Sequence, residues 1–85
     1  MSLILYSRLD CPLCDDGLKI ALAVARRHGM DLRRIDVDSA DPETFQRHRY
    51  RVPIVCWERG GEEKELGWGR LCRARIEGQL RKAGK

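Results

Sequence analysis

The residues best suited to chemistry in this chain are two cysteines, Cys11 and Cys14, in the segment Cys-Pro-Leu-Cys. A short apolar stretch over about residues 3–6 precedes them and a long helical pattern follows, so they lie where a strand is expected to turn into a helix. The first turn of a helix has unpaired backbone N–H groups and the positive end of the helix dipole, which favour a thiolate over a thiol. Because the thiolate is the nucleophile of thiol–disulfide exchange, the spacing and placement predict a redox-active pair.

The residue between the cysteines predicts different roles for the two thiols. Pro12 suits the first helical position, because its missing N–H costs nothing there and its φ is already helical. Cys11 is then the capping residue, exposed, with its sulfur over the open N–H groups, and Cys14 lies one turn further in. From this difference in exposure we expect Cys11 to attack a disulfide and Cys14 to resolve the mixed disulfide that forms.

Two other interpretations of the cysteine pair are a zinc site and an inert pair. A closed structural zinc site needs four ligands, but the chain has no second Cys-x-x-Cys, and Cys56 and Cys72 each stand alone in an apolar pattern. The pattern therefore favours redox chemistry and predicts no metal. We interpret Cys56 and Cys72 as buried small apolar residues, with a regulatory or second resolving role for Cys72 as the alternative.

Three acids near the pair, Asp10, Asp15 and Asp16, oppose a negative charge on Cys11. A nearby carboxylate disfavours a second anion, so these acids offset part of the helix-dipole effect. A less stabilised thiolate makes the reduced form less favourable, which predicts a reductant of low potential rather than a strong oxidant.

Length and composition predict one small domain over residues 1–82, with residues 83–85 as a frayed tail. The net charge of +4 and the pI of about 9.1 come from basic residues that are mixed with acids and lack an aromatic platform, so we expect no nucleic-acid partner. The apolar start is too short for a signal peptide, and no stretch is long enough to span a membrane. We expect a cytoplasmic monomer that does not bind a membrane.

The hydrophobic pattern predicts seven elements in the order βαβαββα. The first strand, helix and second strand form a right-handed crossover with parallel strands, Gly60-Gly61 predicts a hairpin turn, and the polar fourth strand suits a sheet edge. This order predicts an α/β fold, a four-stranded mixed sheet with helices on both faces. The expected strands are 3–6, 31–37, 52–57 and 63–66, and the expected helices are 12–27, 42–48 and 70–81.

Aromatic residues and histidines outside the cysteine pair are given structural roles. We expect Phe45 to anchor the second helix in the core, and Trp57 to be partly buried at the sheet edge. Trp68 is expected to cover the core, with the lip of a substrate groove as the alternative. His28 and His48 lie near helix ends, where a cation suits the dipole.

These residues, in this order of elements, resemble a known family over essentially the whole chain. Tyr6-Ser7, Arg8, the Cys-Pro-Leu-Cys segment and Val52-Pro53 resemble a glutaredoxin of the thioredoxin superfamily, and most closely the short bacterial glutaredoxin-like proteins. The resemblance implies the thioredoxin fold and a cis peptide bond at Pro53. It also implies that the backbone N–H and C=O of Val52 pair with a bound thiol peptide, and that Arg8 helps to hold the glutathione carboxylate and the thiolate.

The sequence departs from the family pattern at three places. Leu13 stands where classical dithiol glutaredoxins often have an aromatic residue, and Arg51 stands where the family usually has Thr. The Gly67-Trp68-Gly69 segment is followed by no acid, whereas the family has an Asp there that grips the γ-glutamyl end of glutathione.

The resemblance and the residues together predict a thiol–disulfide oxidoreductase that reduces protein disulfides or glutathione mixed disulfides. Cys11, Cys14 and Pro53 are the expected catalytic residues, and glutathione is the expected cosubstrate, with no tightly bound cofactor. The alternative is a non-enzymatic binding module that docks a protein partner, or holds a metal, through Cys11 and Cys14. The expected substrate-binding residues are Arg8, Pro12, Leu13, Arg51 and Val52.

Overall fold

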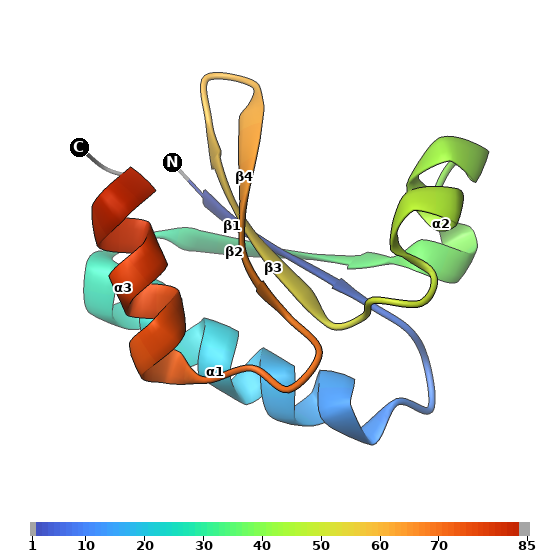
Figure 1. Ribbon diagram of the computed structural model, residues 1–85, viewed down its shortest axis with the longest axis horizontal. Helices are drawn as coiled ribbons and strands as arrows, with labels where there is room; N and C mark the ends of the chain where they lie inside the picture. Colours follow the sequence, from blue (N-terminus) through green and yellow to red (C-terminus); the bar gives the residue numbers. More distant parts are fainter. Residues whose placement is uncertain (1, 84–85) are drawn as a thin grey trace.

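The computed structural model describes residues 2–83 of the chain and contains one four-stranded sheet with three α-helices (Figure 1). Its strands lie in the order β2-β1-β3-β4, with β1 and β2 parallel and the other pairs antiparallel. This arrangement confirms the predicted fold class. The elements are β1 (Ser2–Ser7), α1 (Pro12–His28), β2 (Asp31–Asp36), the short 3-10 helix η1 (Val37–Ser39), α2 (Pro42–His48), β3 (Ile54–Arg59), β4 (Glu62–Trp68) and α3 (Arg73–Ala83).

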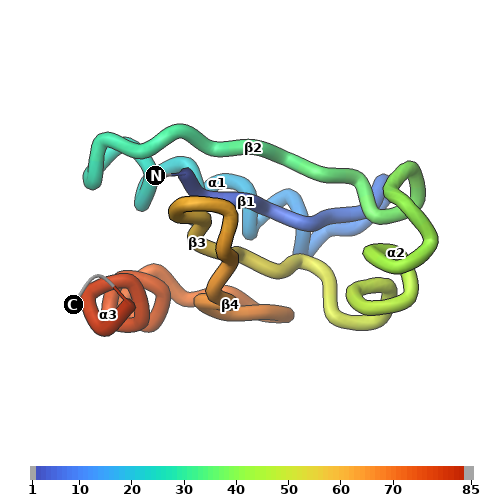
Figure 2. The backbone as a smooth tube through the Cα atoms, turned by 90° about the horizontal axis from the view of Figure 1, so that it is seen from above, coloured from blue at the N-terminus to red at the C-terminus, as the bar shows by residue number. Residues whose placement is uncertain are grey.

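Helices α1 and α3 lie on one side of the sheet and α2 lies on the other, near one end (Figure 1). The view from above shows β2 and β4 as the two edges of the sheet (Figure 2). The larger core lies between the sheet and the helices α1 and α3, because alternate residues of β1 and β3 meet the apolar stripes of both helices. Its buried members are Leu3, Leu5, Ala21, Val24, Ala25, Val55, Trp57, Leu66, Ile76 and Leu80.

The opposite face of the sheet carries a smaller core. The intervening residues of β1 and β3 point to this side, where α2 lies over only one end of the sheet (Figure 1) and η1 contributes Val37. Its buried members are Ile4, Tyr6, Val37, Ile54 and Cys56.

Helix termini follow the signals in the sequence. Gly29 ends α1 in the left-handed conformation, with a φ of 63°, and the Met30 N–H bonds to the Ala25 carbonyl. Asp41 caps α2 by accepting a hydrogen bond from the Thr44 N–H. The hydrogen bond from the Thr44 hydroxyl, and then the one from this N–H, hold the pKa of Asp41 below its usual value.

Helix α3 departs from its predicted bounds at both ends. It begins at Arg73 rather than at residue 70, and it includes Ala83, which we expected in the frayed tail. The rest of that tail, residues 84–85, lies outside the described residues. Because α3 starts later, Cys72 precedes the helix and is exposed, so its predicted burial is wrong.

Three further predictions about burial need correction. Phe45 is only half-buried, and His48 is the residue of α2 that enters the core, where its ring lies 4.4 Å from the ring of Tyr6. Trp57 is fully buried, because α3 covers its side of the sheet. Trp68 does not cover the core: it ends β4 with 55% of its surface exposed.

Candidate redox site

The two cysteines of the motif are joined as a disulfide at the start of α1, with their Cα atoms 5.1 Å apart. Cys11 is the capping residue of α1, and its Sγ accepts a hydrogen bond of 3.2 Å from the Cys14 N–H. Pro12 occupies the first turn, as its fixed φ allows. The sulfur of Cys11 therefore meets an N–H of the first helical turn, as the sequence predicted.

The two sulfurs differ in their exposure to solvent. Cys11 is partly exposed, whereas Cys14 is completely buried. A disulfide of another molecule can approach only the first of them. This difference agrees with the predicted order, in which Cys11 attacks and Cys14 resolves.

Pro53 forms the second part of the site. The Val52–Pro53 peptide bond is cis, as the resemblance implied, and Pro53 is buried at the start of β3. The Gly69 N–H donates a 2.8 Å hydrogen bond to the Pro53 carbonyl, which ties the end of β4 to this loop. Within residues 2–83, Val52 takes part in no backbone hydrogen bond, so its N–H and C=O are open to a bound peptide.

Gly17 allows the close approach of α1 to the Pro53 loop. A Cβ at this position would lie 2.9 Å from Leu71 Cδ1 and 3.1 Å from Pro53 Cγ. Both distances are shorter than ordinary van der Waals contact, so a side chain would push the cysteine helix away from Pro53. The sequence signal for this role is a glycine inside a helical pattern, which often has a packing reason; we had not identified it.

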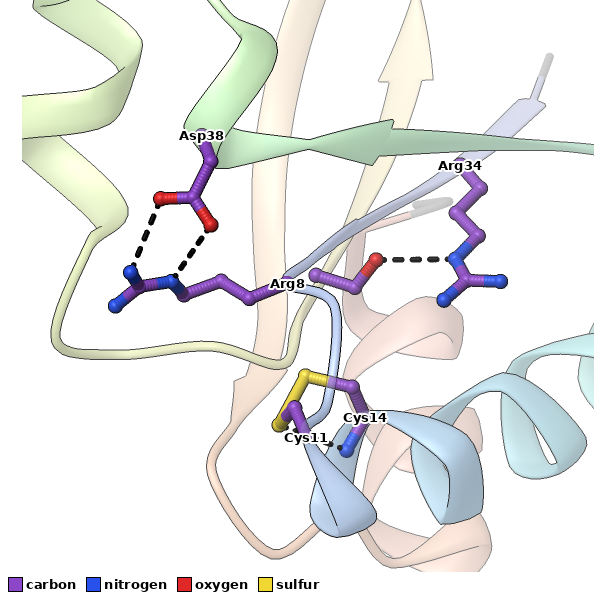
Figure 3. Close-up of a disulfide and its surroundings, with 6 residues drawn as sticks. Arg8, Cys11, Cys14, Arg34 and Asp38 are labelled. Atoms are coloured by element: carbon purple, nitrogen blue, oxygen red, sulfur yellow. Dashed lines mark hydrogen bonds and ion pairs between the residues drawn. A yellow bond between two sulfur atoms is a disulfide. The ribbon is translucent and has the colours of Figure 1, made fainter.

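The Arg8 side chain lies near the site but is paired with an acid of the chain itself. Its Nε and one terminal nitrogen each lie 3.0 Å from an oxygen of Asp38, a two-point ion pair. Figure 3 shows the guanidinium turned toward Asp38 and away from the disulfide. The same figure shows Arg34, whose Nε donates to the Ser7 hydroxyl at 3.1 Å.

Arg51 is likewise engaged within the chain. Its guanidinium forms an ion pair with Glu65 and lies 5.0 Å from the centre of the Trp68 ring. The two arginines that we expected to bind substrate, Arg8 and Arg51, are therefore both neutralised by acids of the chain. Their predicted role with a substrate carboxylate would require these pairs to open.

The other groups that could do chemistry are not placed for it. Burial raises the pKa of the Cys56 thiol to about 12, and Glu63 and Glu65 add to this effect, so Cys56 stays protonated. Burial and a 2.6 Å hydrogen bond to Glu63 also raise the pKa of Tyr6. Among residues 2–83, no group of three or more His, Cys, Asp or Glu side chains is arranged to hold a metal ion.

A model of one protein family matches residues 2–81, almost the whole chain, and its description is glutaredoxin-like domain (DUF836). The chain belongs to this glutaredoxin-like family. The match confirms the predicted resemblance. The chain's fold and its cysteine pair fit a redox function of the kind found in the thioredoxin superfamily.

Solved structures of similar proteins agree with this membership. Target protein XcR50 from X. campestris is 27% identical, with a TM-score of 0.69 over 95% of this chain and 97% of its own. Thioredoxin 1 from Thermosipho africanus TCF52B is 20% identical, with a TM-score of 0.67 over 100% of both chains, and thioredoxin O1 from Arabidopsis thaliana in its oxidised state is 14% identical, with a TM-score of 0.61 over 96% of this chain and 75% of its own. The last two show the fold alone. No curated protein matches the chain.

No described helix is both long and apolar enough to cross a membrane.

Proposed function

We propose that this glutaredoxin-like chain is a thiol–disulfide oxidoreductase that reduces disulfides through Cys11 and Cys14. The observation that carries the proposal is the disulfide at the start of α1, with a partly exposed Cys11 at the cap and a buried Cys14 one turn further in. This geometry exposes the sulfur that must attack and shields the sulfur that must resolve. The cis bond before Pro53 and the open backbone groups of Val52 support it.

The reaction starts from the reduced pair. The Cys11 thiolate attacks one sulfur of a substrate disulfide, the substrate S–S bond breaks, and the departing sulfur takes up a proton. Cys14, after losing its proton, attacks Cys11 and releases the second substrate sulfur as a thiol. Two electrons have then passed to the substrate, and the chain holds the Cys11–Cys14 disulfide. Two molecules of an external thiol, for which glutathione is our candidate, reduce that disulfide again and leave as their own disulfide.

The chain's own residues favour the first step. The N–H groups at the start of α1 stabilise the Cys11 thiolate, because the positive end of the helix dipole faces the sulfur. The Val52 backbone can pair with the segment that carries the substrate disulfide. We propose that the protein works in the cytoplasm as a monomer, with no metal or tightly bound cofactor and with no nucleic-acid or membrane partner.

The test measures whether the protein catalyses the reduction of a mixed disulfide between glutathione and a small thiol. Glutathione and glutathione reductase supply the electrons. We expect turnover by the wild type and none by Cys11→Ser, because serine cannot form the mixed disulfide. Cys56→Ala is the matched control: it removes a thiol whose raised pKa keeps it inert, and it should keep the activity.

Two results would count against the proposal. Equal turnover by Cys11→Ser would show that the pair does not carry the reaction. Failure of the wild type to form a reversible Cys11–Cys14 disulfide, followed by mass, would favour a binding module that docks a partner without redox chemistry.

A further inference from the structure

The large apolar side chains that are exposed gather around the redox site. Leu9 and Leu13 stand on either side of Cys11 in the sequence, with 74% and 41% of their surfaces exposed. Such side chains are costly to leave in water unless another surface covers them. The exposed set is Leu9, Leu13, Leu22, Tyr50 and Trp68.

Trp68 and Tyr50 belong to the Pro53 side of the same region. Trp68 pairs in register with Ile54, the residue after Pro53, and 55% of its surface is exposed. Tyr50 lies three residues before Pro53 and is 78% exposed. Only Leu22, on α1, belongs to neither side of the site. We call Leu9, Leu13, Tyr50 and Trp68 the apolar rim, because each is exposed and lies within three residues of Cys11 or Pro53, or pairs with the residue that follows Pro53.

Two hollows adjoin this rim, one on each side of the loop between β4 and α3. The first has a volume of about 450 Å³ and is lined by Leu13, Asp16, Gly17, Lys19, Ile20, Arg70 and Leu71. The second has a volume of about 250 Å³ and is lined by Gly67, Trp68, Arg70, Leu71, Cys72, Arg75 and Ile76. Arg70 and Leu71 form the wall that the two hollows share.

The second hollow combines apolar walls with positive charge. It contains two arginines, Arg70 and Arg75, and no acid. In residues 2–83, neither of these arginines forms an ion pair. They differ in this from Arg8 and Arg51, whose charges are already neutralised by acids of the chain. Two positive charges that no acid of the described chain neutralises therefore lie beside Trp68.

We propose that the redox site acts on disulfides in partner polypeptides whose segment beside the disulfide carries an apolar and an acidic side chain. The apolar side chain packs on Leu13 and Trp68, and the carboxylate binds Arg70 and Arg75. Opposite charges placed in this way select a partner and speed its encounter more than they add affinity. The inference rests on the proposed function, because the bound partner is reduced by the same exchange: its disulfide gains two electrons from Cys11 and Cys14, which an external dithiol then reduces again.

The experiment uses synthetic peptides that each hold one disulfide between two cysteines. One peptide has Leu and Glu beside the disulfide, the second has Leu and Lys, and the third has Ser and Glu; oxidised glutathione is the fourth probe. The kcat/KM of the full chain is measured for each, with dithiothreitol as the external dithiol. We expect the Leu–Glu peptide to react about tenfold faster than the Leu–Lys peptide, because its contact with the two exposed arginines is attractive and that of the Lys peptide is repulsive.

Charge reversal at Arg70 provides the sharper test. Arg70→Glu should remove or reverse the preference for the acidic peptide, while its rate with oxidised glutathione changes less. The matched control is Arg26→Glu, which makes the same charge change in the last turn of α1 at an exposed residue outside the rim. It should leave the preference unchanged.

The side chain of Leu13 tests the apolar half of the inference. Leu13→Ser should slow the reaction with the Leu–Glu peptide by a larger factor than the reaction with the Ser–Glu peptide. Equal rates for all three peptides, or an unchanged preference in Arg70→Glu, would overturn the inference while the proposed function stands. Absence of exchange with every probe would overturn both.

Discussion

The two faces of the sheet are buried by different means. On one face, α1 and α3 pack apolar side chains against β1 and β3. On the other, α2 covers only one end, and yet Ile4 and Tyr6 are 1% and 5% exposed. We attribute the difference to the charged residues of the second face, whose long side chains can shield the apolar ones.

Ion pairs and hydrogen bonds on this second face connect strands that are not neighbours. Arg33 of β2 reaches Glu58 of β3 at 3.0 Å, across β1, and Tyr6 of β1 donates to Glu63 of β4, across β3. Hydrocarbon stems of charged residues can shield apolar surface while their heads stay in water. The helix-covered face is thus a packed interior, whereas the other is closed by side chains that can rearrange.

The largest expected effect comes from matched truncations of β1. Leu5→Ala, on the helix-covered face, should cost about 3–5 kcal/mol in the free energy of unfolding, because a rigid cavity remains. Ile4→Ala, on the other face, should cost about 2–3 kcal/mol, because the charged side chains can collapse into the space. Urea denaturation measures both. An equal or larger cost for Ile4→Ala would contradict the difference between the faces.

A pH-dependent loss of stability is expected from His48. Burial, and then Arg47 and Arg51, hold the pKa of His48 below its usual 6.5, while Glu65 and Glu63 act weakly in the other direction. The unfolded chain therefore binds a proton more readily than the folded one, so stability is full above the ordinary pKa and falls as the pH drops below it.

His48→Phe keeps a ring against Tyr6 and removes a buried Nδ1 that has no hydrogen-bond partner. We expect its stability at pH 8 to lie within about 1 kcal/mol of the wild type, and the loss between pH 7 and pH 5 to shrink. His28→Gln, on the other side of the sheet, should leave that loss in place. Thermal unfolding at several pH values measures this loss. If the stability of His48→Phe fell with pH as steeply as that of the wild type, His48 would not be the source of the loss.

The smallest effect concerns the pair Arg33–Glu58. Both side chains are partly exposed, so a double-mutant cycle with alanine should give a coupling of about 0.2–1 kcal/mol that weakens with added salt. A coupling that salt does not change would mean that the pair is more desolvated than its exposure indicates. On the helix-covered face, Glu77 of α3 lies 3.2 Å from Arg73 and 3.9 Å from Arg27 of α1. The same cycle on one of these pairs gives a coupling to compare with that of Arg33–Glu58.

The fold could be predicted because its signals are local. The apolar stretches, the Asp-Pro start of α2, Gly29 and the Gly60-Gly61 turn each act within a few residues. What failed depended on distant partners. The exposure of Cys72 follows from where the β4–α3 loop ends, and the burial of His48 follows from a Tyr6 ring that only the folded chain brings near.

The candidate site shows the same division. The cysteine motif alone located the helix cap and the exposed sulfur, and the family resemblance supplied the cis bond at Pro53. Neither could show that Arg8 and Arg51 are paired with acids of the chain, since those acids lie far away in the sequence. Nor could the sequence show that Arg70 and Arg75 lie together in one hollow without an acid, since this depends on how the β4–α3 loop folds.

The unequal burial of the two sulfurs has a practical consequence. A Cys14→Ser chain can start the exchange but cannot finish it, so an attacked partner stays joined to Cys11 by a covalent bond. Because Cys14 is completely buried, its hydroxyl replacement would not disturb the surface that meets the partner. The Cys14→Ser chain can therefore trap a transient partner covalently, long enough for the partner to be isolated and sequenced.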